Sequence, residues 1–165
     1  MDFDPKKLEV RKLIQEDVLA FNSLVHLFNV VFEEDEDAIG TEKNLLKLLG
    51  NSHFVAMAAF YENEIAGGLT AYELPMYYSD HSEIFLYDLA VKPEYQRMGV
   101  GKSLIHALKE YCVQNGIYEF FVLAHEEDEH ALEFYRSTGG KSEKVINFIY
   151  AASNSPETLS SGVTI

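Results

Sequence analysis

The clearest chemistry in this sequence belongs to a short segment with two glycines, Gln96-Arg97-Met98-Gly99-Val100-Gly101-Lys102. Glycines separated by one residue let the backbone approach an anion closely. The segment also begins a helix-like stretch, and the first N–H groups of a helix have no partner within it and carry the positive end of its dipole. Two glycines at a helix start are common for structural reasons alone, but the apolar run and the proline turn before them favour binding. The sequence therefore predicts a cradle for a diphosphate-bearing cofactor.

Asp88 is the second candidate, because it interrupts the apolar run from Ile84 to Val91. An unpaired charge is costly to bury, so this carboxylate must be paired, hydrated or functional. Capping a local irregularity or pairing with an arginine is the ordinary explanation. If the carboxylate is partly desolvated, its pKa moves up and its charge favours a cationic ligand. Glu83 lies on the opposite face of a regular strand, so it could act together with Asp88 only across a bulge.

Helix and strand patterns must position these residues. The predicted helices are residues 16–32, 41–49, 99–115 and 128–137, and the predicted strands are residues 8–14, 53–61, 65–74, 82–91, 117–124 and 141–150. The strand, helix and strand within residues 84–124 fit a crossover between parallel strands, whereas the hairpin of residues 53–74 requires antiparallel pairing. We expect a mixed sheet in a single domain over residues 1–150, followed by a flexible tail over residues 151–165.

The composition describes an acidic chain of 165 residues with a formal net charge of −14. This charge argues against a nucleic-acid partner and against anchoring on anionic lipid, and it would attract a cationic partner. Solubility alone explains the charge of many acidic proteins. The single cysteine, Cys112, and the lack of an apolar N-terminal segment favour the cytoplasm. The histidine spacing does not indicate a metal site.

The residues around the cradle resemble a known family. The run from Leu89 to Gln96, followed by Gly99 and Gly101, resembles the Q-x-x-G-x-G signature of the GNAT superfamily of N-acetyltransferases. The resemblance implies acetyl-coenzyme A as cosubstrate. It also implies a mixed α/β, GNAT-like fold, in which about four helices flank a mixed, mostly antiparallel sheet of about six strands. From about residue 45 to residue 150 the chain is similar to the aminoglycoside 3-N-acetyltransferase branch, most specifically over Ser82–Val91, where that branch carries an acceptor-site carboxylate.

The resemblance implies catalytic and acceptor-site roles. Asp88 would be the base, because an amine with a reference pKa of about 10.4 must lose a proton before it attacks a thioester. Tyr135 follows Ala131 as in the superfamily's A-x-x-x-Y and would protonate the departing thiolate, although a core tyrosine is the usual meaning of such spacing. Asp128 stands where the superfamily often has an Asn that holds the pantetheine arm. Glu83 is either a second acceptor contact or an exposed residue at a strand start.

The pantetheine arm is expected to pair like an added strand with residues 89–91, which requires a free edge on their strand. Arg97 and Lys102 would add charge at the diphosphate, unless they are solvated surface cations. The predicted cofactor-binding residues are Leu89, Ala90, Val91, Gln96, Arg97, Met98, Gly99, Val100, Gly101 and Lys102. The predicted substrate-binding residues are Glu83, Asp88 and Asp128, and the predicted catalytic residues are Asp88 and Tyr135.

These features predict an N-acetyltransferase that passes acetyl directly from acetyl-coenzyme A to a primary amine in a ternary complex. The branch resemblance implies an aminoglycoside-like amino sugar, acetylated on its 3-amino group. Acetylation of a polyamine or a protein amine, and a non-catalytic acyl-coenzyme A binding module, are the alternatives. No metal, nucleic acid or membrane partner is expected, and an exposed strand edge is compatible with a homodimer.

Overall fold

The computed structural model describes residues 3–35 and 38–150, so the predicted tail and part of the acidic run at residues 33–37 lie outside the described residues. Nine helices and strands follow one another along this part of the chain. They are β1 (Leu8–Lys12), α1 (Val18–Val31), α2 (Glu42–Leu49), β2 (Phe54–Tyr61), β3 (Glu64–Pro75), β4 (Ser82–Val91), α3 (Val100–Gln114), β5 (Phe120–Val122) and α4 (Glu129–Ser137).

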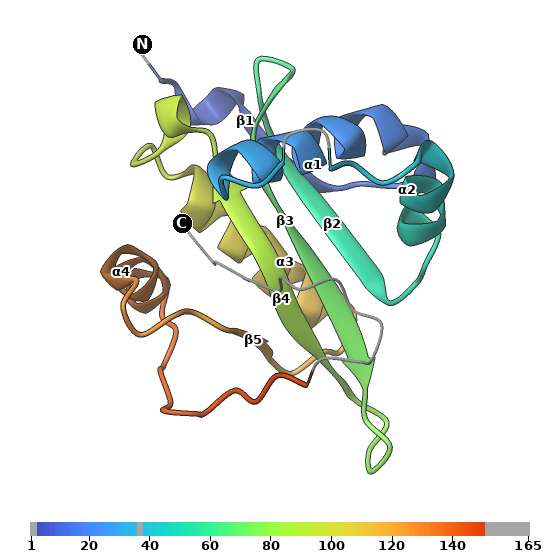
Figure 1. Ribbon diagram of the computed structural model, residues 1–165, viewed down its shortest axis with the longest axis vertical. Coiled ribbons are helices and arrows are strands. Elements are labelled where there is room, and N and C mark those ends of the chain that lie inside the picture. The colour runs from blue at the N-terminus through green and yellow to red at the C-terminus, as the bar shows by residue number, and fades with distance from the viewer. Residues whose placement is uncertain (1–2, 36–37, 151–165) are drawn as a thin grey trace.

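The strands form one mixed sheet in the order β1-β2-β3-β4-β5. The first three pairs are antiparallel, and β4 pairs with β5 in parallel across the α3 crossover. Figure 1 shows α1 and α2 on one face of the sheet and α3 behind the other face, and a separate hydrophobic core fills each of these two layers. The predicted GNAT-like, mixed and mostly antiparallel architecture is confirmed.

The helices pack through the apolar faces that their periodicity predicts. On α3, Val100, Leu104, Leu108 and Cys112 are all buried. On the opposite face, a Cβ added at Gly68 would lie only 2.5 Å from a methyl carbon of Leu24, so the glycine allows α1 to pack directly on β3. The two layers bury Leu89, Ala90 and Val91 at the C-terminal end of β4.

The predicted last strand, residues 141–150, is wrong, because none of these residues lies in a strand. Val145, Ile146 and Phe148 are 69–80% exposed. Strand β5 is also shorter than predicted, with three residues. Apolar and β-branched residues favour extended backbone, but a strand also needs a partner edge, which the pattern of one segment does not specify. Over the part of the chain that the structure describes, the sheet therefore has five strands instead of about six.

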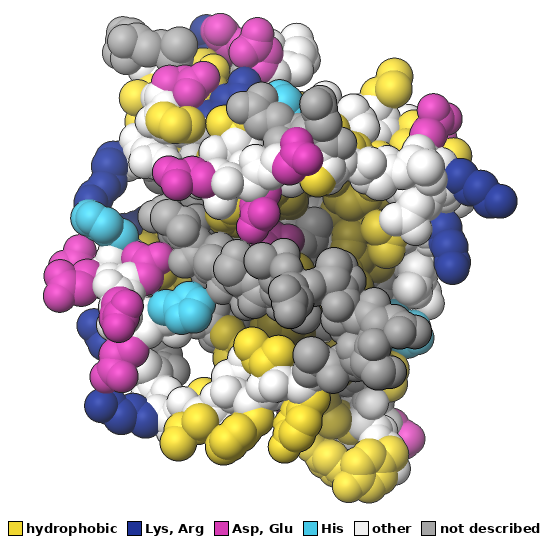
Figure 2. Space-filling model, viewed as in Figure 1, with side chains coloured by type: hydrophobic (Ala, Val, Ile, Leu, Met, Phe, Trp, Pro, Cys, Tyr) yellow, Lys and Arg dark blue, Asp and Glu magenta, His cyan; other side chains and the backbone are white. Residues whose placement is uncertain are grey.

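The surface is divided between acidic and apolar regions. In the view of Figure 2, acidic side chains gather on the left, where Figure 1 places α4, and hydrophobic side chains line the lower edge. The exposed apolar residues include Tyr77 and Tyr78 of the β3–β4 turn. Within residues 3–35 and 38–150, no helix has the length and hydrophobicity needed to span a bilayer.

Candidate active site

A β-bulge in β4 lies at the centre of the candidate site. In the pairing with β3, Asp88 lies opposite Thr70 and Leu86 lies opposite Ala71, so Tyr87 has no residue opposite it. A bulge inserts one residue into a strand and redirects the side chains that follow it. The bulge therefore changes which residues of β4 share a face with Asp88.

The bulge places Asp88 and Glu83 on the same face of the sheet. Their partners on β3 are Thr70 and Leu74, which are an even number of residues apart and so point the same way. Directly opposed residues in an antiparallel pair also share a face. The sequence indicated that these two carboxylates could act together only if a bulge lay between them, and the structure contains that bulge.

Asp88 is partly buried, and the described part of the chain supplies no lysine or arginine as its partner. The Thr70 hydroxyl donates a hydrogen bond to Asp88 Oδ2 at 3.2 Å, and Thr70 itself is only 6% exposed. No described lysine or arginine forms an ion pair with Asp88. Burial raises the pKa of this carboxyl above its usual range, and the hydrogen bond from Thr70 partly opposes that effect. A carboxylate in this state is a stronger base than an ordinary aspartate and attracts a cation.

The edge of β4 beyond Asp88 is free, as strand addition requires. Strand β5 pairs with β4 over Ile84–Leu86, and it ends at Val122, the partner of Leu86. Among the described residues, no strand pairs with the β5 side of Leu89–Val91. The backbone groups on this side can therefore bond to an extended ligand lying between β4 and β5.

The turn between β4 and α3 has the backbone geometry of an anion cradle. The Gln96 side chain donates to the carbonyl of Val91 at 3.2 Å and fastens the turn to the end of β4. Arg97 has φ 62° and Gly99 has φ 89°, both in the left-handed region. Such turns point successive N–H groups into one concavity. The first intrahelical bond is donated by the Ser103 N–H to the Gly99 carbonyl, and the N-cap residue Gly99 has no side chain to cap α3. Within the described residues, the N–H groups of residues 100–102 are therefore available to an anion.

The two glycines of the cradle have different environments. A Cβ at Gly99 would meet no atom of the described residues within 4 Å, so these residues leave open space beside the turn. A Cβ at Gly101 would lie 2.9 Å from the Phe134 ring, so this glycine allows α4 to pack against the first turn of α3. Gly99 therefore provides room for a ligand, and Gly101 brings α4 close to the cradle.

Tyr135, which follows Phe134 on α4, lies near both Asp88 and Asp128. Burial and, to a lesser degree, the charges of Asp128 and Asp88 raise the pKa of the Tyr135 phenol above its ordinary value. The phenol is thus protonated at neutral pH and can serve as a proton donor. Asp128 caps α4, because its Oδ1 accepts the Ala131 N–H at 2.9 Å. The structure therefore brings Asp88, Tyr135 and Asp128 into one electrostatic neighbourhood, beside the free edge of β4.

Sequence reasoning missed Thr70 and the tyrosines beside Asp88. Thr70 tunes Asp88 from the neighbouring strand, and Tyr72 has a raised pKa caused by burial and by the charges of Tyr87 and Asp88. Thr70 is a polar residue in an apolar run of β3, and this could have marked it as a candidate. That its partner is Asp88 depends on the register between β3 and β4, which the sequence does not show. The contact of Tyr72 with Tyr87 depends on the bulge.

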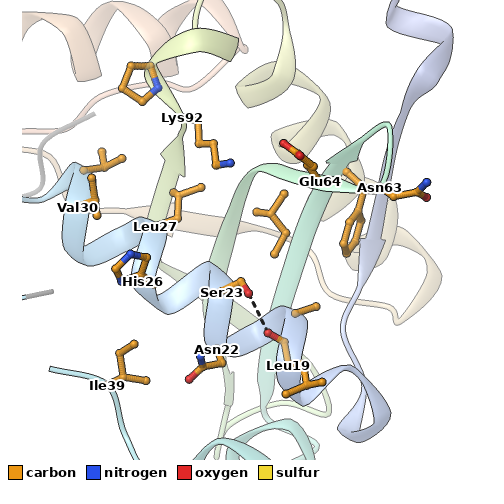
Figure 3. Close-up of a pocket in the computed structure, with 15 residues that line it drawn as sticks. Leu19, Asn22, Ser23, His26, Leu27, Val30, Ile39, Asn63, Glu64 and Lys92 are labelled. Carbon is orange, nitrogen blue, oxygen red and sulfur yellow. Dashed lines mark hydrogen bonds between the residues drawn. The ribbon is translucent and has the colours of Figure 1, made fainter. Parts of the chain in front are cut away.

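A pocket of about 860 Å³ lies away from these residues, between α1, the β2–β3 turn and Lys92. Figure 3 shows its lining, in which the Ser23 hydroxyl donates to the carbonyl of Leu19. None of the predicted catalytic, substrate-binding or cofactor-binding residues lines this pocket. Its size alone does not make it the candidate site.

A comparison with family models identifies the class of protein. Residues 18–139 match the model of the acetyltransferase (GNAT) family. The chain belongs to this family, and it is an acetyl-transferring enzyme. A search of curated protein sequences finds no match.

Solved structures include similar enzymes. The aminoglycoside acetyltransferase meta-AAC0020, from an uncultured soil metagenomic sample, is 39% identical, with a TM-score of 0.86 over 90% of this chain and 98–99% of that one, in complexes with trehalose and with sisomicin. The aminoglycoside acetyltransferase HMB0005, also from an uncultured soil metagenomic sample, is 36% identical, with a TM-score of 0.84 over 88% of this chain and 99% of that one. AAC(6')-Iy in complex with CoA is 18% identical, with a TM-score of 0.72 over 88% of this chain and 95% of that one, and shares the fold.

Proposed function

We propose that this protein acetylates a primary amine of an aminoglycoside-like amino sugar, at its 3-amino group, using acetyl-coenzyme A as cosubstrate. The observation that carries the proposal is the placement of Asp88, a partly buried carboxylate that no described lysine or arginine pairs with, beside the open edge of β4 and within electrostatic range of Tyr135. Similarity to two aminoglycoside acetyltransferases, at 36–39% identity, supports the acceptor class.

The acetyl-coenzyme A site would consist of two backbone surfaces and a few side chains. The pantetheine arm would pair with the free edge of Leu89–Val91, and the diphosphate would lie over Gly99 and the N–H groups of residues 100–102. Arg97 and Lys102 would supply positive charge at the same place. The open space at Gly99 and the lack of a helix cap support this fit.

The reaction follows from the two titratable groups. Asp88 takes a proton from the acceptor ammonium, directly or through a water, and the freed nitrogen attacks the thioester carbonyl carbon. As the C–S bond breaks, Tyr135 donates its phenolic proton to the leaving thiolate, and the nitrogen, which became positively charged when it attacked, loses its second proton to water. Glu83 and Asp128 would hold further ammonium groups of the acceptor. Before the next cycle, Asp88 releases its proton to solvent and the Tyr135 phenolate takes a proton from solvent, so the enzyme returns to its starting state.

An acceptor panel tests the proposal. Purified protein is incubated with acetyl-coenzyme A and sisomicin, spermidine or a lysine-containing peptide. Free thiol is followed spectroscopically, and the products are identified by mass spectrometry. We expect thiol release and one added acetyl group with sisomicin, and NMR of the product should locate the acetyl on the 3-amino nitrogen. Tyr135→Phe, assayed in parallel, should lower kcat by about tenfold or more.

Other outcomes would contradict the proposal at defined points. Acetylation of spermidine or peptide in preference to sisomicin would show that the acceptor is a polyamine or a protein amine and not an amino sugar. Acetylation of sisomicin on another nitrogen would retain the acceptor class and remove the 3-amino assignment. Acetyl-coenzyme A binding without thiol release for any amine in the panel would reject the reaction assigned to this site.

A further inference from the structure

Four aromatic rings form a continuous surface beside Asp88. The rings of Tyr72 and Tyr87 meet edge to face with centroids 5.7 Å apart, and those of Phe85 and Tyr87 do so at 5.6 Å. Phe85 also stacks on Phe121 of β5 at 5.1 Å and an interplanar angle of 12°. We call the residues Tyr72, Phe85, Tyr87 and Phe121 the aromatic wall.

The bulge explains why this wall is accessible. Tyr72 and Phe85 lie opposite each other on the face that carries Asp88, and the bulge residue Tyr87 packs against both. Tyr87 is 51% exposed and Phe121 is 41% exposed. Helices α1 and α2 cover the rest of this face, but they do not bury these two rings. An apolar ring surface this large, beside a carboxylate base, is suited to contact a ligand.

The wall lies between two carboxylates. Asp88 is at one end, and Glu83, four residues before the bulge residue Tyr87, is at the other. Their β3 partners Thr70 and Leu74 are four residues apart on a regular strand, which is about 13 Å. No described lysine or arginine forms an ion pair with Glu83. Both ends therefore attract cations, and the aromatic faces between them favour a cation as well.

We propose that the aromatic wall and Glu83 select an acceptor with several rings and at least two well-separated ammonium groups, an inference that rests on the proposed function. One amine reacts at Asp88, the apolar faces of the rings lie on the wall, and a second ammonium lies between Tyr87 and Glu83. A single amino-sugar ring is too short to reach from Asp88 to Glu83. The wall thus sets the acceptor length, a property separate from the transfer chemistry.

Two substitutions of Tyr87 test the wall. Tyr87→Leu removes the ring and keeps an apolar side chain, whereas Tyr87→Phe keeps the ring. For sisomicin we expect Tyr87→Leu to raise KM about five- to twentyfold with kcat nearly unchanged, and Tyr87→Phe to stay within about twofold of the wild-type enzyme. The KM for acetyl-coenzyme A should be unchanged in both variants, which also shows that the bulge has kept its fold.

Glu83→Gln tests the far end of the wall, with Glu73→Gln as the matched control. Glu73 lies opposite Ile84, on the other face of the sheet, and its carboxylate lies 4.0 Å from His53 Nδ1. We expect Glu83→Gln to raise the sisomicin KM about five- to twentyfold and Glu73→Gln to leave it unchanged. The single-ring diamine 2-deoxystreptamine, measured as a competitor of sisomicin, should bind the wild type and Glu83→Gln equally.

The outcomes separate this inference from the proposed function. If the wild type acetylates sisomicin but both Tyr87→Leu and Glu83→Gln keep its KM, the aromatic wall is not an acceptor surface and the transfer reaction stands. If Glu83→Gln weakens 2-deoxystreptamine as much as sisomicin, Glu83 does not measure acceptor length. If the wild type acetylates no amino sugar, the proposed function is wrong, and the inference that rests on it is wrong as well.

Discussion

At the scale of single residues, the catalytic role proposed for Asp88 comes with a cost to stability. Burial disfavours the charged form of Asp88, and the Thr70 hydroxyl donates a hydrogen bond that only partly offsets this cost. A structural carboxylate in this position would be expected to have a cation beside it. The described residues supply no such cation, so the ammonium group of a substrate could take its place beside Asp88.

Replacing Asp88 should therefore separate activity from stability. Asp88→Asn keeps an oxygen that can accept from Thr70 but cannot take a proton. We expect kcat to fall about 10²- to 10⁴-fold, with acetyl-coenzyme A affinity, measured by calorimetry, unchanged. A variant with wild-type kcat would exclude Asp88 as the base.

The same variant should unfold at a higher temperature. Because the pKa of Asp88 is raised in the folded state, ionisation destabilises the fold, and this cost is fully present only above the folded pKa. At pH 7, Asp88→Asn should melt a few degrees above the wild type. The difference should vanish as the pH falls below the ordinary aspartate range of about 3.9 and Asp88 becomes neutral. A constant difference across this range would contradict the assignment of the cost to charge.

Thr70 offers a test of the pH dependence. Its hydroxyl lowers the pKa of Asp88, so Thr70→Val, which removes the hydroxyl and keeps the shape, should raise that pKa further. The base must be deprotonated to act, and kcat/KM should therefore rise with pH through the pKa of Asp88. We expect the acidic limb of the pH profile to move to higher pH in Thr70→Val. An unmoved limb would show that another group sets it.

At the scale of elements, the sequence predicted most helices and strands, because apolar periodicity reports which face of an element is buried. The cradle between β4 and α3 was predicted for a similar reason, since its glycines and flanking elements are local in sequence. The bulge at Tyr87 was not predicted, because a bulge depends on register with β3. The left-handed Arg97 and the unpaired segment at residues 141–150 also depend on neighbours that one segment does not encode.

Substitution of the two glycines of the cradle should affect different properties, cofactor affinity for Gly99 and kcat for Gly101. Gly99→Ala places a Cβ in the open space and on a left-handed backbone, which costs about 1–2 kcal/mol. It should weaken acetyl-coenzyme A binding about tenfold or more by blocking close approach. Gly101→Ala should instead displace Phe134 and with it Tyr135, so that kcat falls more than cofactor affinity.

A second-site change provides the control for Gly101. Phe134→Leu shortens the ring that an added Cβ would touch, so the double variant Gly101→Ala with Phe134→Leu should recover kcat relative to Gly101→Ala alone. The same change cannot rescue Gly99→Ala, because Phe134 is not near Gly99. Equal effects of the two glycine substitutions on acetyl-coenzyme A affinity, without rescue, would contradict this division of roles.

At the scale of the whole molecule, the charge of the chain complements the proposed acceptor. The formal net charge is −14, and acidic side chains gather over α4 on the face seen in Figure 2. Such a field attracts a polycation over distances longer than any single contact. The two proposed surfaces thus differ in character: the cradle would bind an anion through local backbone N–H groups, and the field of the molecule would guide a cation.

Ionic strength should therefore act mainly on the acceptor. The Debye length shortens from about 30 Å at about 0.01 M salt to about 3 Å at about 1 M, which removes long-range attraction. Across this range we expect kcat/KM for sisomicin to fall about tenfold or more, and that for a monoamine acceptor of similar chemistry to fall much less. Because kcat at saturating acceptor reports chemistry within the closed complex, it should change little. A parallel loss for both acceptors would place the salt effect in acetyl-coenzyme A binding and refute steering by the acidic surface.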